Sequence, residues 1–246
     1  MPDLSTWRWL FPKERHHCWA LKDKLEALAP KEGAVLDLGC GDNSTCAYLR
    51  TATREVWGTD FQTHPTMQHP EWFRLLPSTG EIPFEDNSFD LVSAVWVLEH
   101  VQEPETFLNE IKRILRPGGR FLGHSINRNH PITIARRLTN FLPHGLTQKV
   151  IAKLYGRAEH DTFPTCYRLN SKRQLRRAAE RAGLDLINIT RYADPGYYKF
   201  NRFVLHLGIM FDWLCERLLG CGKIYFTVEM QKPEEEHFTA GMRLAG

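Results

Sequence analysis

The chain has 246 residues, of which 42% are hydrophobic and 25% are charged. This composition supplies enough apolar side chains for a sizeable core and excludes a disordered, collagen-like or coiled-coil chain. The 32 basic and 29 acidic residues leave a net charge of only +3. A nucleic acid is therefore not expected as a partner.

The length is long for one compact domain and short for two, so we expect a single domain over residues 1–246. The six cysteines form no Cys-x-x-Cys pair at zinc-ligand spacing, and no metal is expected. No signal-like leader follows Met1, and the longest apolar stretch, around 203–215, is too short to cross a bilayer. These features predict a cytoplasmic protein.

In chain order, the predicted elements begin with a helix over 14–29, which Pro30 ends. Short strands alternate with helices after it. We expect strands at 34–38, 55–60, 72–76, 89–95 and 120–126, and helices from about 43 and over 104–115. Residues 116–119 are expected to form a turn between a helix and a strand.

The alternation lapses over 127–170, where short helices are expected near 131–140 and 146–155. It resumes with a helix at 171–182, a strand at 184–191, a helix at 200–219 and a last strand at 223–230. The predicted fold class is α/β: a Rossmann-like, seven-stranded, mostly parallel sheet with helices on both faces. It has an N-terminal helix and helical insertions before strands six and seven.

A glycine turn follows the first strand, in the stretch Val35-Leu36-Asp37-Leu38-Gly39-Cys40-Gly41. Ligands of open α/β sheets bind at this carboxyl end, and glycines let the backbone approach them closely. Asp60 ends the second strand, where its carboxylate can accept hydrogen bonds from both hydroxyls of a ribose. Phe61 could cover an adenine face. The third glycine of the dinucleotide fingerprint is missing, and Asp37 suits a cationic ligand better than a pyrophosphate.

Three further motifs follow: Ile-Pro-Phe-Glu-Asp-Asn-Ser-Phe-Asp-Leu-Val at 82–92, Val-Leu-Glu-His-Val at 97–101, and Leu-Asn-Glu-Ile-Lys-Arg-Ile-Leu-Arg-Pro-Gly-Gly at 108–119. Together with the glycine turn and Asp60, they resemble the class I S-adenosylmethionine-dependent methyltransferases of the methyltransferase domain 11 type. The resemblance covers residues 33–126 strongly and 165–232 weakly. It implies S-adenosyl-L-methionine as the cofactor.

The resemblance also implies roles for individual residues. Asp37, Gly39 and Gly41, with Cys40 between the glycines, would line the methionine end of the cofactor, and Asp60 would hold its ribose. The remaining cofactor contacts would be Ser78, Thr79, Gly80 and Glu81 beside the adenine, and Val95 and Trp96 at the sulfonium side. Ser78 stands where the family usually has an Asp that bonds the adenine amino group, and Asn43 replaces a common third glycine.

On this resemblance, 33–126 is the cofactor-binding half, 127–170 an insertion that forms an acceptor lid, and 171–246 the C-terminal helix–strand units. The candidate catalytic residues are His100, His124, His160 and Asp161, since an acceptor that loses a proton needs a base. His100 could instead cap the next helix, and His124 could instead be a buried, hydrogen-bonded histidine. We expect methyl transfer to an oxygen of a small-molecule or lipid- or saccharide-linked acceptor.

Two other functions stay open: an NAD-dependent oxidoreductase, and a non-catalytic S-adenosylmethionine-binding module on the same fold. The basic run at 171–177 is expected to be a solvated helix face, although it would suit an anionic acceptor or a peripheral membrane contact. For the apolar helix at 200–219, burial is the default, with a dimer seam and an interfacial anchor as alternatives. The oligomeric state is left open.

Overall fold

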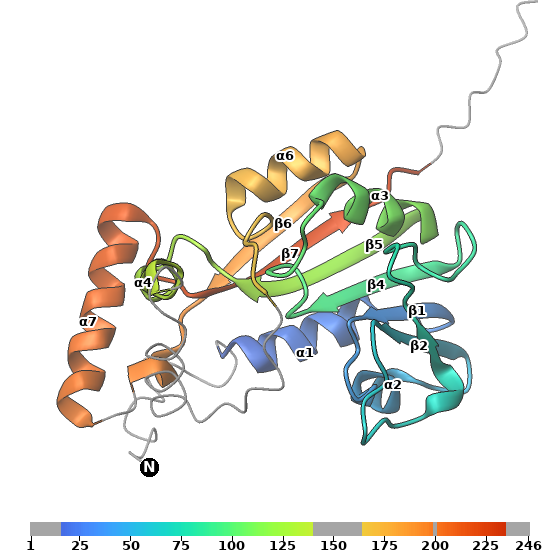
Figure 1. Ribbon diagram of the computed structural model, residues 1–246, viewed down its shortest axis with the longest axis horizontal. Coiled ribbons are helices and arrows are strands. Elements are labelled where there is room, and N and C mark those ends of the chain that lie inside the picture. Colours follow the sequence, from blue (N-terminus) through green and yellow to red (C-terminus); the bar gives the residue numbers. More distant parts are fainter. Residues whose placement is uncertain (1–15, 140–163, 199–200, 235–246) are drawn as a thin grey trace, which may run out of the picture.

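The computed structural model describes residues 16–139, 164–198 and 201–234. Within these residues the chain folds around a seven-stranded sheet in the order β3-β2-β1-β4-β5-β7-β6 (Figure 1). Strands β1 to β5 are paired in parallel, whereas β7 runs antiparallel to both β5 and β6. The predicted seven-stranded, mostly parallel sheet is thus confirmed. The strands are β1 (Gly33–Leu38), β2 (Arg54–Asp60), β3 (Phe73–Leu75), β4 (Phe89–Val95), β5 (Leu115–Ile126), β6 (Asp185–Tyr192) and β7 (Tyr225–Gln231).

Helices cover both faces of the sheet, because successive side chains of a strand point to opposite sides. In β1, Val35 packs into a core with α1 (His17–Leu28) and α2 (Ser44–Leu49). Its neighbour Leu36 belongs to the opposite core, with α3 (Pro104–Ile114) and α6 (Lys172–Ala182). Both residues are completely buried. The sheet is therefore apolar on both faces, as expected of a parallel sheet between two helical layers.

Local capping signals fix the ends of the later helices. The Ser171 side chain accepts the Gln174 N–H at the start of α6, and Gly183 ends that helix in the left-handed conformation. Asn201 and Gly220 do the same for α7 (Arg202–Leu219). The remaining helical elements are α4 (Pro131–Thr139) and the short 3₁₀ turns η3 (Pro70–Trp72) and η5 (Pro195–Tyr198). No helix in the described ranges is long and apolar enough to cross a membrane.

One predicted turn is wrong. Residues 116–119, expected before the fifth strand, lie inside β5, which begins at Leu115. Leu115 pairs with Phe89, and the next pairing joins Arg120 to Leu91, so four residues of β5 are accommodated as a bulge. Gly118 has φ of 76° and donates its N–H to Lys232 O. The helix expected near 146–155 lies outside the described residues.

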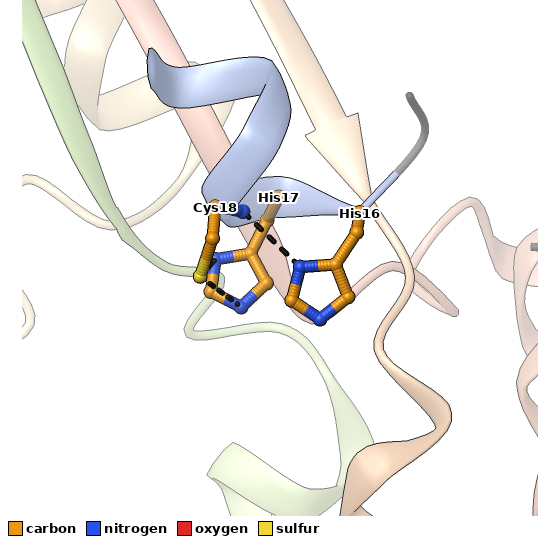
Figure 2. Close-up of side chains that lie close together, drawn as sticks. All are labelled: His16, His17 and Cys18. Atoms are coloured by element: carbon orange, nitrogen blue, oxygen red, sulfur yellow. Dashed lines mark hydrogen bonds between the residues drawn. The ribbon is translucent and has the colours of Figure 1, made fainter. Parts of the chain in front are cut away.

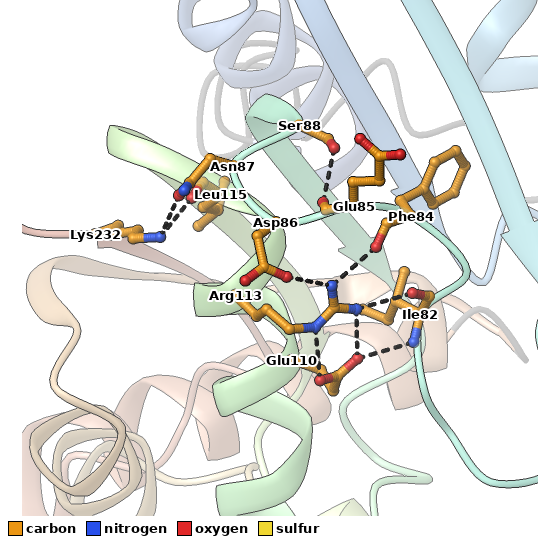
Figure 3. A network of polar contacts seen from close by, with 10 residues as sticks. All are labelled: Ile82, Phe84, Glu85, Asp86, Asn87, Ser88, Glu110, Arg113, Leu115 and Lys232. Atoms are coloured by element: carbon orange, nitrogen blue, oxygen red, sulfur yellow. Dashed lines mark hydrogen bonds and ion pairs between the residues drawn. The ribbon is translucent and has the colours of Figure 1, made fainter.

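An ion-pair network holds the 82–88 segment against α3 (Figure 3). The Arg113 guanidinium donates to the carbonyls of Ile82 and Phe84 and to the carboxylates of Asp86 and Glu110, at 2.8–2.9 Å. Its hydrogen bond lowers the pKa of the Glu110 carboxyl. The stretch read from sequence as part of a motif is thus a structural clamp, which fixes the chain just after the 78–81 loop.

Candidate functional site

The glycine turn after β1 is tied to the end of β2. Gly39 N and Cys40 N both donate to Thr59 O, at 2.7 and 3.2 Å. Gly39 and Gly41 have φ of 76° and 55°, a region that side chains rarely adopt. A Cβ on Gly39 would lie 2.4 Å from Val97 Cγ2, whereas a Cβ on Gly41 would meet nothing within 4 Å. Gly39 is therefore required by packing, and Gly41 borders open space.

Asp60 closes this turn with its carboxylate. Oδ2 accepts the Gly41 N–H at 3.0 Å, and Oδ1 accepts the Phe61 N–H at 2.7 Å. The Phe61 ring is 57% exposed beside it. The carboxylate expected at a ribose thus lies directly against the glycine turn, with an uncovered aromatic ring next to it.

Asp37 is the buried charge of this edge. Only 3% of the residue is exposed, and Ser93 Oγ donates to its Oδ1 at 2.8 Å. Burial raises the pKa of Asp37 to about 6, although its hydrogen bonds oppose the shift. A cationic ligand beside this carboxylate would restore its ionised form.

Asn43 stands where a third glycine is common, and its backbone conformation explains why an Asn is tolerated there. It is completely buried and has φ of 61°, the left-handed conformation that Asn tolerates better than most residues. Its Nδ2 donates to His69 O at 3.2 Å. Gly58 in β2 makes room for it, because a Cβ there would lie 2.1 Å from Asn43 Oδ1 and 2.8 Å from Cys40 Sγ. Cys40 is buried in this packing.

The 78–81 loop lies next to Asp60 along the same edge. Leu76 N donates to Asp60 O at 2.7 Å, and Gly80 N closes a turn on Pro77 O at 2.9 Å. Gly80 has φ of 79° and faces open space. The side chains of Ser78, Thr79 and Glu81 are exposed. This is the arrangement expected of a loop that flanks a ligand.

Trp96 marks the boundary of this region, directly after half-buried Val95. Its φ of 61° is uncommon for a bulky residue, and such strained backbone is concentrated at functional sites. Trp96 N donates to His124 O in β5 at 2.9 Å. The ring is 41% exposed and meets the His124 ring edge-on at 4.7 Å.

Trp96 belongs to an aromatic cluster whose six residues come from five elements and the loop after β4: His17, Trp96, His124, Tyr192, Tyr197 and Tyr225. His124 is fully buried, and its ring is parallel to that of His17. His17 Nδ1 and His124 Nε2 are 3.2 Å apart. The Tyr225 ring lies 4.1 Å from that of His17, and its hydroxyl donates to the Tyr197 hydroxyl at 2.9 Å. The cluster places hydrogen-bonding groups inside an apolar enclosure.

Both cluster histidines are unprotonated at neutral pH. Burial, and then the nearby His17, lowers the pKa of His124 to about 3, although the backbone of Phe226 opposes the shift. Burial also lowers the pKa of His17 to about 4, although Asp194, 3.8 Å from His17 Nε2, opposes the shift. The Nδ1 atom of His124 has no hydrogen-bond partner among the described residues. A buried ring nitrogen without a partner is costly and needs an explanation.

The start of α1 brings His16 and Cys18 next to His17 (Figure 2). Donor atoms of these three side chains all lie within 4.8 Å of one another, as in a metal site. However, His16 Nδ1 accepts the Cys18 N–H and caps α1. His17 Nδ1 meets His124, and its Nε2 faces Asp194. We therefore interpret this group as the start of the helix and as part of the aromatic cluster.

His100 lies apart from the aromatic cluster's histidine pair. Its Nδ1 donates to Pro164 O at 2.9 Å, and the preceding Glu99 accepts the N–H groups of Cys166 and Tyr167 on its carbonyl. The end of the 127–170 insertion is thus fastened to the loop after β4. His160 and Asp161, the other two catalytic candidates, lie outside the described residues.

The structure describes some of the basic residues of the 127–170 insertion. Arg128 is half-buried and donates to Tyr167 O, and Arg137 lies over the Tyr167 ring. The basic residues of α6 are exposed, as predicted for a solvated face: Lys172, Arg173, Arg176 and Arg177. Lys149, Lys153 and Arg157 lie outside the described residues.

Sequence reasoning missed His17, Tyr197 and Tyr225. Each belongs to a segment with no recognisable motif, and they meet only because α1, η5 and β7 converge on the end of β5. The one sequence signal was the pair His16-His17 at the predicted helix start. It does not indicate a partner in β5.

Comparison with known proteins gives a family match over the residues that form this edge of the sheet. Residues 36–123 match a family model described as a methyltransferase domain. The match contains the glycine turn, Asp60 and Trp96, and ends immediately before His124.

The chain is 33% identical over 98 residues to a protein of Mycolicibacterium smegmatis named "Probable S-adenosylmethionine-dependent methyltransferase", and this match covers 38% of each protein. It is 25% identical over 218 residues to a Demethylmenaquinone methyltransferase of Bacillus cereus, with 80% of this chain and 86% of that one covered. A solved complex between the Haloferax volcanii Trm112 methyltransferase activator and a methyltransferase contains a chain of the same fold. It is 20% identical, has a TM-score of 0.56, and is matched over 96% of this chain and 98% of that chain.

Proposed function

We propose that this chain, which belongs to the class I S-adenosylmethionine-dependent methyltransferases, methylates its acceptor on oxygen. We place the acceptor beside the aromatic cluster. The cofactor is S-adenosyl-L-methionine, whose sulfonium makes its methyl carbon electrophilic. The acceptor is a small molecule or a lipid- or saccharide-linked group. The name of the Bacillus cereus relative, Demethylmenaquinone methyltransferase, supports a small-molecule acceptor.

In this proposal the cofactor lies along the carboxyl ends of β1, β2 and β4. Gly41 supports its position, since the space beside this residue is open. Asp60 would exchange its backbone hydrogen bonds for the ribose hydroxyls. Asp37, with its raised pKa, would face the cationic methionine end. The other proposed contacts are Gly39, Cys40, Phe61, Ser78, Thr79, Gly80, Glu81, Val95 and Trp96.

The single observation that carries the acceptor proposal is the unpartnered Nδ1 of buried His124. Asp194 favours the proton on Nε2 of His17, because a carboxylate can only accept there. His17 Nδ1 then accepts the proton of His124 Nε2, which leaves a lone pair on His124 Nδ1. An acceptor hydroxyl could donate to this lone pair and pass its proton to Nδ1 as its oxygen takes the methyl group, so that the S–CH₃ bond breaks and S-adenosylhomocysteine is released.

Trp96 is the only exposed residue of the six in the cluster, so we propose that the acceptor enters beside it. Movement of this ring would uncover His124 and leave the acceptor between the histidine pair and the cofactor. Rate would then come from alignment of the oxygen with the S–CH₃ bond and from exclusion of water.

The proposal that 127–170 covers the acceptor is supported by the contacts of 164–170 with His100 and Glu99. His100 acts there as a positioning residue rather than as the base. The roles of His160 and Asp161 stay predictions, as does the division of one domain into 33–126, 127–170 and 171–246.

The test is to incubate the purified chain with methyl-labelled S-adenosylmethionine and fractionated lipid and small-molecule extracts. Mass spectrometry then identifies the labelled product and the methylated atom. Product from the native chain, with little from His124→Asn, supports the proposal. His130→Asn is the matched control, since His130 is equally buried but bonds Asp212 outside the cluster. A labelled nitrogen or carbon would contradict the oxygen assignment.

A further inference from the structure

Helix α7 has a second apolar face. Its inner face packs on the protein through the buried residues Leu205, Gly208, Asp212 and Cys215. The opposite side should be polar in a helix at the surface of a water-soluble domain. Instead it carries large apolar side chains that are 43–75% exposed: Phe203, Leu207, Met210, Phe211, Trp213, Leu214, Leu218 and Leu219.

Helix α4 extends this apolar surface. Ile134 and Leu138 are 43% and 64% exposed, and α4 lies beside α7 (Figure 1). The two helices are joined through His130, just before α4, whose Nε2 lies 3.1 Å from Asp212 Oδ1 in α7. We call the exposed apolar residues of the two helices the α4–α7 face. A patch of this kind marks an interaction site.

Among the residues of α4 and α7, the exposed charged side chains are all basic. Arg136 on α4 and Arg202 and Arg217 on α7 are exposed. The acids of α7 do not balance Arg202 and Arg217, since Asp212 is buried and Glu216 pairs with Arg191 at 2.9 Å. Two copies of this face packed together would bring like charges into contact. An anionic surface would complement them.

We propose that the α4–α7 face docks on an anionic lipid surface, with α7 lying in the membrane interface. Apolar side chains would enter the boundary of the acyl chains while the arginines meet the lipid phosphates. Asp212 connects this face to the site, because Tyr198 of η5 donates to it at 2.7 Å and the adjacent Tyr197 belongs to the aromatic cluster. Delivery of a lipid-linked acceptor from the same membrane to the cluster rests on the proposed function; the docking itself does not.

The experiment measures binding of the full chain to vesicles without cofactor or acceptor. Vesicles of phosphatidylcholine alone are compared with vesicles that contain about one third phosphatidylglycerol. We expect binding to the anionic vesicles that weakens as salt is raised. Equal binding to both kinds of vesicle, or none to either, would overturn the proposal. Either result leaves the methyl-transfer proposal standing, because no step of that reaction is measured.

Two variants locate the surface. Met210→Glu should weaken binding to anionic vesicles about tenfold, since it removes an apolar contact and adds a negative charge. The control is Ile187→Glu on β6, an exposed apolar residue with the same change of charge, which should bind as the native chain does. Arg217→Gln should weaken binding about fivefold, as expected for one basic residue near the surface.

Sedimentation equilibrium of the same samples tests whether a second copy of the chain, rather than a lipid surface, covers the α4–α7 face. If Met210→Glu splits a dimer of the native chain and leaves vesicle binding unchanged, the face is a seam between two copies and the lipid proposal is wrong. Melting temperatures of all variants, expected to stay close to that of the native chain because the substituted side chains are exposed, show that each protein is folded.

Discussion

The two halves of the sheet's carboxyl edge are built in different ways. At the ends of β1 and β2 the site is mostly backbone: two left-handed glycines, their N–H groups and one carboxylate, all within a short stretch of chain. At the ends of β5, β6 and β7 it is made of rings contributed by five elements and the loop after β4, most of them far apart in sequence. A local backbone site is recognisable from a motif, whereas an assembled ring enclosure is not. The family match contains Trp96 but no other residue of the aromatic cluster, and it ends just before His124.

The largest effect is expected from a substitution in the aromatic half, which should reduce methyl transfer and spare cofactor binding. His124→Asn removes the proposed base and should reduce methyl transfer by about 10²–10⁴-fold. Affinity for S-adenosylmethionine should stay within about threefold, because His124 is not among the proposed cofactor contacts. Turnover of the identified acceptor and calorimetry of cofactor binding give the two readouts. A parallel loss of cofactor affinity would show that the halves are not separate.

Asp60→Ala should act on the other half of the site and weaken cofactor binding. We expect a loss of about 1–3 kcal/mol in cofactor binding, since two charge-assisted hydrogen bonds to the ribose are removed. Asp60→Asn is the matched variant, because it keeps the shape and one acceptor oxygen and should lose less. Calorimetry on folded protein checks both. Unchanged affinity in the alanine variant would remove Asp60 from the site.

The glycine turn offers a smaller effect with two distinguishable causes. Gly41→Ala should cost about 1–2 kcal/mol of stability from its positive φ alone, because its Cβ meets no atom. Gly39→Ala should cost more, since its Cβ would also overlap Val97 Cγ2. Gly41→Val should additionally hinder the cofactor. Chemical denaturation ranks the alanine variants, and equal losses would contradict the packing argument.

The pH dependence of stability gives the most gradual effect. The folded-state pKa values of His17 and His124, about 4 and about 3, lie below the ordinary value of 6.5. The unfolded chain therefore binds more protons below pH 6.5, and stability falls as the pH drops from 6.5 towards 4. The slope is at most about 1.4 kcal/mol per pH unit for each histidine.

Asp37 acts with the opposite sign. Its raised pKa of about 6 means that the folded chain takes up a proton first, which adds stability as the pH falls through 6. The measurement is therefore the free energy of unfolding of the native chain and of a His17→Asn/His124→Asn variant. Urea denaturation from pH 7.5 to about 4.5 gives both pH profiles, and their difference isolates the histidines. The variant should show a flatter or inverted profile. The same slope in both proteins would contradict the buried-histidine interpretation.

Sequence reasoning located the strands because hydrophobic runs and turn residues are local signals. The helix at 171–182 was bounded by Ser171 and Gly183, which are capping residues in the structure. The bulge at 116–119 was missed because Pro-Gly-Gly reads as a turn, while the flanking residues Leu115 and Arg120 both pair with β4 and keep the bulge within the strand. Asp37, Asp60 and the glycines could be placed in one region from spacing alone. His17 could not, since its neighbour His124 is 107 positions away.

The antiparallel β7 has a consequence for the way in which this protein is made. It lies between β5 and β6, and β6 pairs with no other strand of the described chain. While the ribosome is still adding residues before 225, β5 lacks its outer neighbour and β6 has no hydrogen-bonded partner. The nascent chain therefore presents unpaired strand edges, which attract other unfolded chains, until β7 has been synthesised. Closure also needs contacts about 100 residues apart, which form slowly. We infer that the sheet closes only after β7 has been synthesised, and that Tyr225, the first residue of β7, enters the aromatic cluster among the last.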